Sequence, residues 1–523
     1  MKRLICIALA AVFGLGFAAA ASAETEVVMS GDARIHANIV THENFTPWNA
    51  RGMNYYTGAP QAAIAGISPG TASEENFTIW ERFRLKTDFI ANETLMFRLG
   101  IRVNNVAWGA SLAVDNPPVA IDVNQAYLKF FIPNTQAQVS AGYMPLALPQ
   151  SKIFGGSLIL DTQWGNTSAA AAVVDIPVVT DTFAIKAGYT RLLSGAADFY
   201  AGGVGTNATT PVADAVDLFF LALPVTIDGF QAIPWASYAN AGRMANWSGL
   251  LGGTALGPTA AWGEVDSSVS MNMVSAASAK LAATSGFNSM WANQSNSYYW
   301  FGLPLNITAL DPVNFYADVL YGAGAMDDRS QSKRSGWFID AGVEYTGLSF
   351  MKPQLMGWWS TGENGSLNDG SERIPFARSF WNVGGSFLYS GNATAFTRNT
   401  LLCNPAGSWG LALSFKDISF VKDLTHRLTI AVVNGTNSPS WARAVASSGL
   451  GGIYATMGKD LTTDEWLVGV NFDHMYKIYD NLDAILELGW ADVSGLRGSV
   501  WGPRNVNNAG DAWKVAFGLR YTF

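Results

Sequence analysis

Cysteine is nearly absent from this chain of 523 residues, in which only Cys6 and Cys403 occur. Cys6 lies in an apolar N-terminal stretch that we expect to be removed on export. Cys403 would then be the only cysteine of the exported protein, so no internal disulfide could form. Stability is therefore expected to come from the fold itself.

Long apolar runs are also missing beyond the N-terminus. Hydrophobic residues make up 49% of the chain, yet no run of eighteen uncharged apolar residues follows residue 23. This absence excludes helical membrane spans. The net charge of −8 argues against nucleic acid as a partner, because such partners need a basic surface.

The first 23 residues have the pattern of a secretory signal. Met1-Lys2-Arg3 is basic, an apolar stretch follows, and Ala21-Ser22-Ala23 is a small-residue cleavage site. An uncleaved anchoring helix is the alternative, but the cleavage site and the lack of following basic residues favour removal. We therefore divide the chain into a signal peptide, 1–23, and a single domain, 24–523.

The last twelve residues, 512–523, alternate strictly. Trp513, Phe517 and Phe523 fall on one side of an extended strand, whereas Lys514 and Arg520 fall on the other. Girdle-type aromatics on one face and charges on the other are typical of a barrel wall between lipid and water. This strand indicates a bacterial outer membrane.

Similar segments recur along the chain, separated alternately by tight turns such as 91–93 and 133–135 and by much longer stretches. Outer-membrane barrels sort their connections in this way, with short periplasmic turns and long external loops. The sequence therefore predicts an all-β fold, a closed antiparallel transmembrane β-barrel.

The predicted strand number is sixteen to twenty, and eighteen is favoured. A closed single-chain bacterial barrel needs an even number. The count is eighteen if 379–389 belongs to a loop, and twenty if 393–402 is a further strand. It is sixteen if 169–176 and 230–238 are not strands.

A basic set is predicted on the inner face of the early strands. Turning the segment 78–90 over would expose three cations to lipid, each at a cost of roughly 2–4 kcal/mol near the midplane. The predicted pore-lining residues are Arg34, Arg82, Arg84, Lys86, Arg98, Arg102 and Lys129. Such a set favours anions in a narrow pore. The alternative is that these cations pair with Asp32, Asp88 and Asp122 and only hold the wall together.

The chain resembles the bacterial general porins, and more closely the homotrimeric outer-membrane porins of Desulfovibrio-type sulfate reducers. The segments that carry the resemblance are Ala21-Ser22-Ala23, ERFRLKTDF (81–89), NQAYLKF (124–130), SAGYMPLALP (140–149) and Tyr521-Thr522-Phe523. The resemblance implies a homotrimer of water-filled barrels. It also implies an external loop that folds inward to narrow each pore, and the stretch 145–168 holds that place.

This constriction loop contributes Lys152 and Asp161 as candidate site residues. Asp161 is its only acid, which departs from the several carboxylates that many general porins carry there. A constriction lined by acids with strong cation preference is therefore not expected.

No catalytic or metal-binding constellation is apparent, and we predict no enzyme and no cofactor. The four histidines, His36, His42, His426 and His474, include no pair with metal-ligand spacing on one element. Oxygen ligands for calcium occur in predicted external loops, at 327–328 and 364–369, although clustered loop acids are more often simply solvated.

Aromatic residues at segment ends are predicted to form girdles at the two membrane interfaces, although a stacking track for sugars is the alternative. They are Phe130, Phe131, Tyr143, Trp358, Trp359, Trp466 and Tyr521.

The predicted function is passive diffusion of small hydrophilic solutes and ions across the outer membrane, in contact with membrane lipid and lipopolysaccharide. The alternatives are a channel specific for a sugar or an organic anion, and an all-β hydrolase.

Overall fold

The structure is a computed structural model that describes residues 25–47, 55–56, 76–108, 121–162, 168–194, 215–242, 295–325, 328, 330–389, 400–447 and 455–523. The predicted signal peptide, 1–23, lies outside these residues. The described strands form one sheet of twenty strands. They are β1 (Glu26–Thr41), β2 (Asn76–Asn92), β3 (Leu95–Ala107), β4 (Ile121–Phe131), β5 (Gln138–Met144), β6 (Ala169–Val179), β7 (Phe183–Ser194), β8 (Ala215–Ala222), β9 (Val225–Ile227), β10 (Phe230–Ala232), β11 (Trp235–Gly242), β12 (Ser295–Ile307), β13 (Val313–Ala325), β14 (Lys333–Tyr345), β15 (Lys352–Ser360), β16 (Ser408–Val421), β17 (Leu424–Gly435), β18 (Trp466–Tyr479), β19 (Leu482–Ser494) and β20 (Ala512–Thr522).

The sheet closes on itself, because its first and last strands pair. β1 and β20 run antiparallel from Asp32 opposite Thr522 to Thr41 opposite Trp513. The amide of Gly31 then donates to the carbonyl of Phe523 at 2.8 Å. Every neighbouring pair is antiparallel, so the predicted closed antiparallel barrel is confirmed.

The wall contains eighteen strands, because two pairs of short strands each form one wall strand. β8 and β9 are separated at Leu223-Pro224, and β10 and β11 at Ile233-Pro234. Proline has no backbone N–H, so it interrupts the ladder at both points. The favoured count of eighteen is confirmed: 169–176 lies in a true strand, 230–238 forms the interrupted one, and 379–389 is not in the wall.

Alternation along each strand decides which side chains face outward. On β20 the outward residues Trp513 and Phe517 are 52% and 55% exposed, whereas the intervening Lys514 and Ala516 are 1% and 0% exposed. The side chains alternate with a period of two, so one face of the strand is apolar and the other carries polar or small residues. The prediction for 512–523 is thus confirmed.

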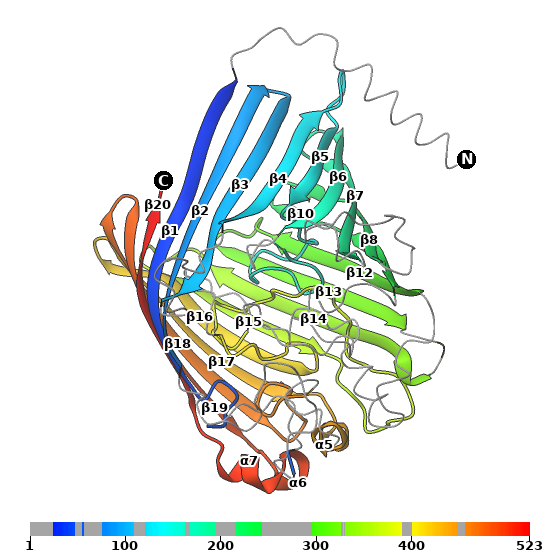
Figure 1. Cartoon of the computed structure of the whole chain (residues 1–523), viewed down its shortest axis with the longest axis vertical. Coiled ribbons are helices and arrows are strands. Elements are labelled where there is room, and N and C mark those ends of the chain that lie inside the picture. The colour runs from blue at the N-terminus through cyan, green and yellow to red at the C-terminus, as the bar shows by residue number, and fades with distance from the viewer. Residues whose placement is uncertain are drawn as a thin grey trace, which may run out of the picture.

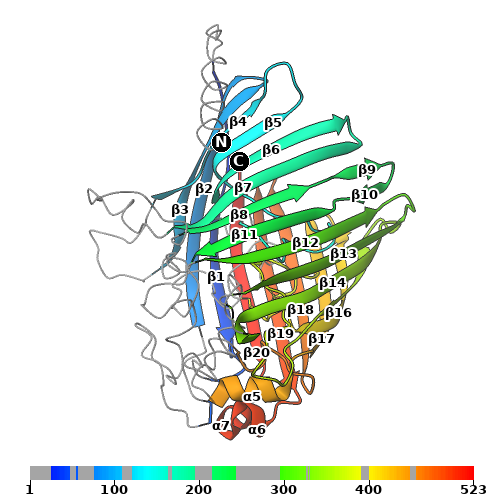
Figure 2. The same ribbon diagram turned by 90° about the vertical axis from the view of Figure 1, so that its right-hand side faces the viewer.

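Short turns gather at one end of the barrel and long connections at the other, which we call the turn end and the loop end. The turn between β16 and β17 is Lys422-Asp423, whereas the much longer stretch 361–407 joins β15 to β16. The loop end carries three short helices, α5 (Pro439–Ser447), α6 (Gly498–Trp501) and α7 (Pro503–Asn507), which lie together in Figures 1 and 2. A single 3-10 turn, η4 (Ser330–Ser332), precedes β14. Within the described ranges, no helix is long and apolar enough to cross a membrane.

Aromatic side chains form a row on the outer face. The rings of Tyr189, Phe219, Tyr238 and Tyr299, on four neighbouring wall strands, have successive centroid distances of 5.1, 6.4 and 5.2 Å. Such a row suits a membrane interface. The girdle prediction is wrong for Trp358, which is 4% exposed, because the next residue, Trp359, occupies the outer face and adjacent strand residues point to opposite sides.

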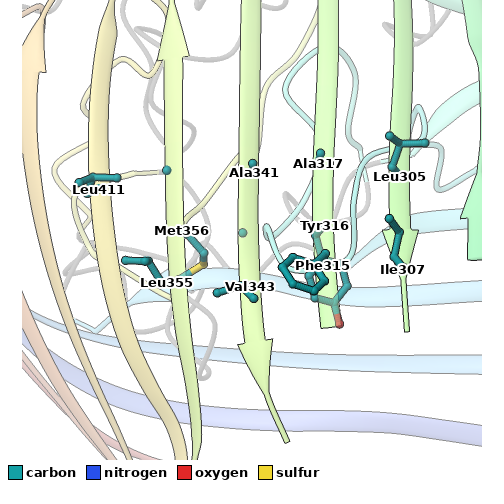
Figure 3. Close-up of a pocket in the computed structure, with 12 residues that line it drawn as sticks. Leu305, Ile307, Phe315, Tyr316, Ala317, Ala341, Val343, Leu355, Met356 and Leu411 are labelled. Atoms are coloured by element: carbon teal, nitrogen blue, oxygen red, sulfur yellow. The ribbon is translucent and has the colours of Figure 1, made fainter. Parts of the chain in front are cut away.

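A hollow of about 500 Å³ lies on the outer face over β12 to β16. Figure 3 shows Leu305, Ala317, Ala341 and Leu355 around it, on the successive strands β12 to β15. The strand register places Ala317, Ala341 and Gly357 in one row, so three small residues lie side by side. The hollow is therefore a shallow depression in the outer surface, and it is separate from the barrel interior.

Candidate functional site

Three arginine side chains on the inner face converge on one aspartate. β1 and β2 pair so that Asp32 lies opposite Arg84 and Arg34 lies opposite Arg82. The Asp32 carboxylate accepts hydrogen bonds from all three guanidinium groups, at N–O distances of 2.7 Å (Arg34), 3.2 Å (Arg82) and 2.5 Å (Arg84). We call these four residues the Asp32 cluster. The three guanidinium groups therefore share this one carboxylate.

The other predicted basic residues extend this wall. Arg98 makes two hydrogen bonds to Asp88, both at 2.6 Å, and Arg102 lies 3.3 Å from Asp122. Lys86 has the inward parity of Arg84 and Asp88 on β2, and Lys129 lies opposite Ser140 of β5. Neither lysine makes an ion pair with any residue that the structure describes. This wall therefore contains arginines that pair with aspartates and two lysines that form no ion pair with the described residues.

One basic residue of this wall, Arg520, was not predicted from the sequence and lies across the barrel seam. Arg520 of β20 lies opposite Arg34 in the register and pairs with Asp483 of β19 at 2.6 Å. The inward parity of Arg520 is visible in the sequence, but its position beside Arg34 depends on closure between the two ends of the chain. The basic wall thus continues from β4 through β1 to β20.

The predicted constriction loop lies inside the barrel as far as it is described, to residue 162. Leu148, Leu158 and Leu160 are at most 2% exposed. The amides of Ser151 and Lys152 donate to Asp318 at 2.8 Å and to Asn306 at 2.9 Å. These acceptors belong to β13 and β12. The loop therefore runs from β5 to the wall formed by β12, β13 and β14, which we call the far wall.

The two site residues of this loop have different environments. Lys152 is exposed, whereas Asp161 is 1% exposed. The amide of Asp161 donates to the carbonyl of Arg378 at 2.8 Å. Burial of Asp161 leaves the described part of the loop, 145–162, without an exposed acid.

A second inward segment, described over 361–389 and 400–407, was not predicted as such. Gly155 pairs with Asn382, and Leu160 pairs with Arg378, so the two segments form one inner layer. Trp381, Phe387 and Leu388 are fully buried in it. A signal was present in the sequence: Gly384-Gly385 interrupts the alternation, and both residues adopt left-handed conformations with φ of 58° and 75°.

Two buried carboxylates anchor both inner segments. Asp318 and Asp340 lie opposite each other on β13 and β14 and are 0% and 1% exposed. Asp340 accepts hydrogen bonds from Gln150 at 3.1 Å and from the Trp381 indole at 3.0 Å. No described cation pairs with either carboxylate. This pair connects the far wall to the constriction loop and to 361–407.

The loops that were considered for calcium show no assembled site. Asn364 donates its side-chain amide to Asp369 and to Glu372, both at 2.8 Å. Asp327 lies outside the described residues. Across the described ranges, no group of three or more histidine, cysteine, aspartate or glutamate side chains is arranged to hold a metal ion.

The structure of this chain is similar to several solved structures of bacterial proteins. They include OccK11 (OpdR) from Pseudomonas aeruginosa, with 10% identity, 95% of this chain and 96% of that chain covered, and a TM-score of 0.48. The outer membrane protein OprD from Pseudomonas aeruginosa has 10% identity, 97% of each chain covered and a TM-score of 0.47. A BenF-like porin from Pseudomonas fluorescens Pf-5 has 9% identity, 95% of this chain and 99% of that chain covered, and a TM-score of 0.46. No family model and no curated protein matches the chain.

Proposed function

We propose that this protein is a bacterial outer-membrane channel through which small hydrophilic solutes and ions diffuse passively, with a preference for anions. The Asp32 cluster carries the proposal, because it gathers three guanidinium groups around one carboxylate on the inner face of a closed barrel. Fixed positive charge in a narrow, poorly screened passage raises the local concentration of anions. No chemical step and no cofactor are required.

The outer surface supports the membrane location. Outward side chains such as Phe517 and Leu519 are apolar and exposed, and aromatic rings flank them. In water this surface would be an extensive apolar patch, whereas in lipid it is matched to its surroundings. In this arrangement the turn end faces the periplasm and the loop end faces outward, toward lipopolysaccharide.

The test is reconstitution in a planar bilayer under a salt gradient. Replacing Arg82→Gln and Arg84→Gln together should lower the anion-to-cation permeability ratio and shift the reversal potential toward cation preference. Arg497→Gln removes one positive charge at a side chain that is 60% exposed near the loop end, and it should leave the potential nearly unchanged. An unaltered reversal potential in the double variant would contradict the proposed role.

A channel specific for an organic anion is the second candidate. It is favoured by the inner layer, since two inward segments pack against the far wall and leave the basic wall facing a reduced lumen. A specific channel would show saturable conductance and block by one carboxylate solute. A linear dependence of flux on concentration for many solutes would favour the general channel.

A homotrimer is part of the proposal and rests on the resemblance to the Desulfovibrio-type porins. Gly31, Ala33 and Ala37 lie on the outer face of β1, where small side chains would allow close subunit packing. Conductance steps in groups of three and a heat-sensitive band on an unheated gel are expected. A single-step channel with one monomeric band would rule out this assembly.

The hydrolase alternative receives no support. The closest histidine pair, His426 and His474, is hydrogen-bonded to no serine and no carboxylate among the described residues.

A further inference from the structure

Two histidines that are far apart in the sequence lie side by side on the outer wall. His426 of β17 and His474 of β18 are direct partners in the strand register. Their Nδ1 atoms are 2.6 Å apart, and their ring centroids are 4.8 Å apart. Sequence reasoning expected no metal pair, because it considered spacing on single elements. The hairpin register creates this pair across two strands.

The pair faces outward near the turn end. His426 has the same parity as the exposed Ile430, and His474 has the same parity as the exposed Phe472. The turn Lys422-Asp423 immediately precedes Leu424, and His426 is the third residue of β17. Both imidazoles are partly exposed, so an ion can reach them from the interface.

The surroundings leave the imidazole nitrogens available. The flanking partners across the strands are Ile418 of β16 and Leu486 of β19, and Phe472 packs edge-on against His474 at 4.2 Å. Apart from the bond between them, neither imidazole makes a hydrogen bond to any described residue. The nearest polar neighbour of each ring is therefore the other ring.

At 2.6 Å, one Nδ1 must carry a proton that it donates to the lone pair of the other. A metal ion that displaces this proton would find both lone pairs directed at one point. Metal–nitrogen bonds of about 2.0–2.1 Å at a tetrahedral angle place the two nitrogens about 3.3 Å apart. A small rotation of two partly exposed side chains provides this opening.

We propose that His426 and His474 form a bidentate site for a divalent transition-metal ion, Cu²⁺, Ni²⁺ or Zn²⁺, on the outer wall of the barrel. Neutral imidazole is a good ligand for these ions. Water completes the coordination sphere, because no carboxylate of the described residues bonds to either ring. Protons compete for the same nitrogens, so the affinity should fall as the pH drops.

The site lies outside the lumen, so its failure would leave the proposed channel activity untouched. The test uses the full-length exported protein in detergent, purified without a histidine tag, and Cu²⁺ as the probe. One Cu²⁺ per chain is expected, with an electron paramagnetic resonance spectrum showing coupling to two imidazole nitrogens. His426→Gln and His474→Gln should each weaken binding at least tenfold.

The matched control is His42→Asn. His42 has a left-handed backbone with φ of 50°, a conformation that asparagine tolerates, and this change should preserve Cu²⁺ binding. Equal binding by the wild type and by both glutamine variants would overturn the proposal, as would no binding by the wild type.

A second measurement needs no variant. Zn²⁺ should protect His426 and His474 of the folded wild-type barrel from diethylpyrocarbonate, with the modified histidines identified by mass spectrometry. Modification at the same rate with and without Zn²⁺ would also overturn the site.

Discussion

The indole N–H of Trp381 donates to the carboxylate of Asp340 at 3.0 Å, and this bond joins an external segment to the far wall of the barrel. Trp381 also packs against Phe154 of the constriction loop, with ring centroids 5.5 Å apart. One side chain therefore holds both inward segments together. The width of the remaining lumen depends on contacts of this kind.

Trp381→Ala should loosen the inner layer. Replacing a fully buried aromatic side chain by alanine typically costs about 3–5 kcal/mol. We expect a lower unfolding temperature, together with larger or noisier single-channel conductance. Trp359→Ala, on the outer face at 43% exposure, is the matched control and should change conductance little. A quiet, unchanged conductance for Trp381→Ala would mean that the inner layer does not limit the pore.

Asp32→Asn should change selectivity in the direction opposite to that of the double arginine variant. It removes the carboxylate that accepts hydrogen bonds from Arg34, Arg82 and Arg84, and so raises the positive charge of the inner face. Anion preference should rise, as measured by reversal potential. Removing one partner of a buried ion pair typically lowers the free energy of unfolding by about 3–5 kcal/mol. The midpoint of urea unfolding should therefore fall. A shift toward cations would show that the cluster does not control the field.

Lys514→Met should destabilise the seam between β19 and β20. Lys514 and Glu487 are both 0% exposed at their side chains and form an ion pair at 2.8 Å. Asp473 lies opposite Glu487 in the register, so removal of the lysine leaves two neighbouring acids with less compensation. A loss of about 3–5 kcal/mol is expected from urea unfolding. Lys352→Met, at an exposed pair with Asp417, should cost far less.

Cys403 should be inert in the folded protein. The thiol is 2% exposed, and burial raises its pKa to about 12, so it is protonated at pH 8. Maleimide should label it only after unfolding in denaturant, as counted by mass spectrometry. Rapid labelling of the native barrel would show that the segment 400–407 opens toward solvent.

Alternation along individual strands allowed the barrel class and the inward set to be predicted. The faces of 78–90 and of 512–523 depend only on residue parity and on the cost of exposing charge to lipid, both of which are local properties. Aromatic content alone wrongly predicted that both Trp358 and Trp359 lie in the outer girdle. Strand parity places only Trp359 on the outer face.

The sequence by itself thus determined the fold class, the favoured strand number and the face on which Arg34, Arg82 and Arg84 lie. Only the tertiary structure decided that 361–389 folds inward, that Arg520 lies beside Arg34 and that His426 meets His474. The physical reason is the separation along the chain of the residues that interact. Parity acts between neighbouring residues, whereas these contacts depend on closure and register between segments that are distant in the chain.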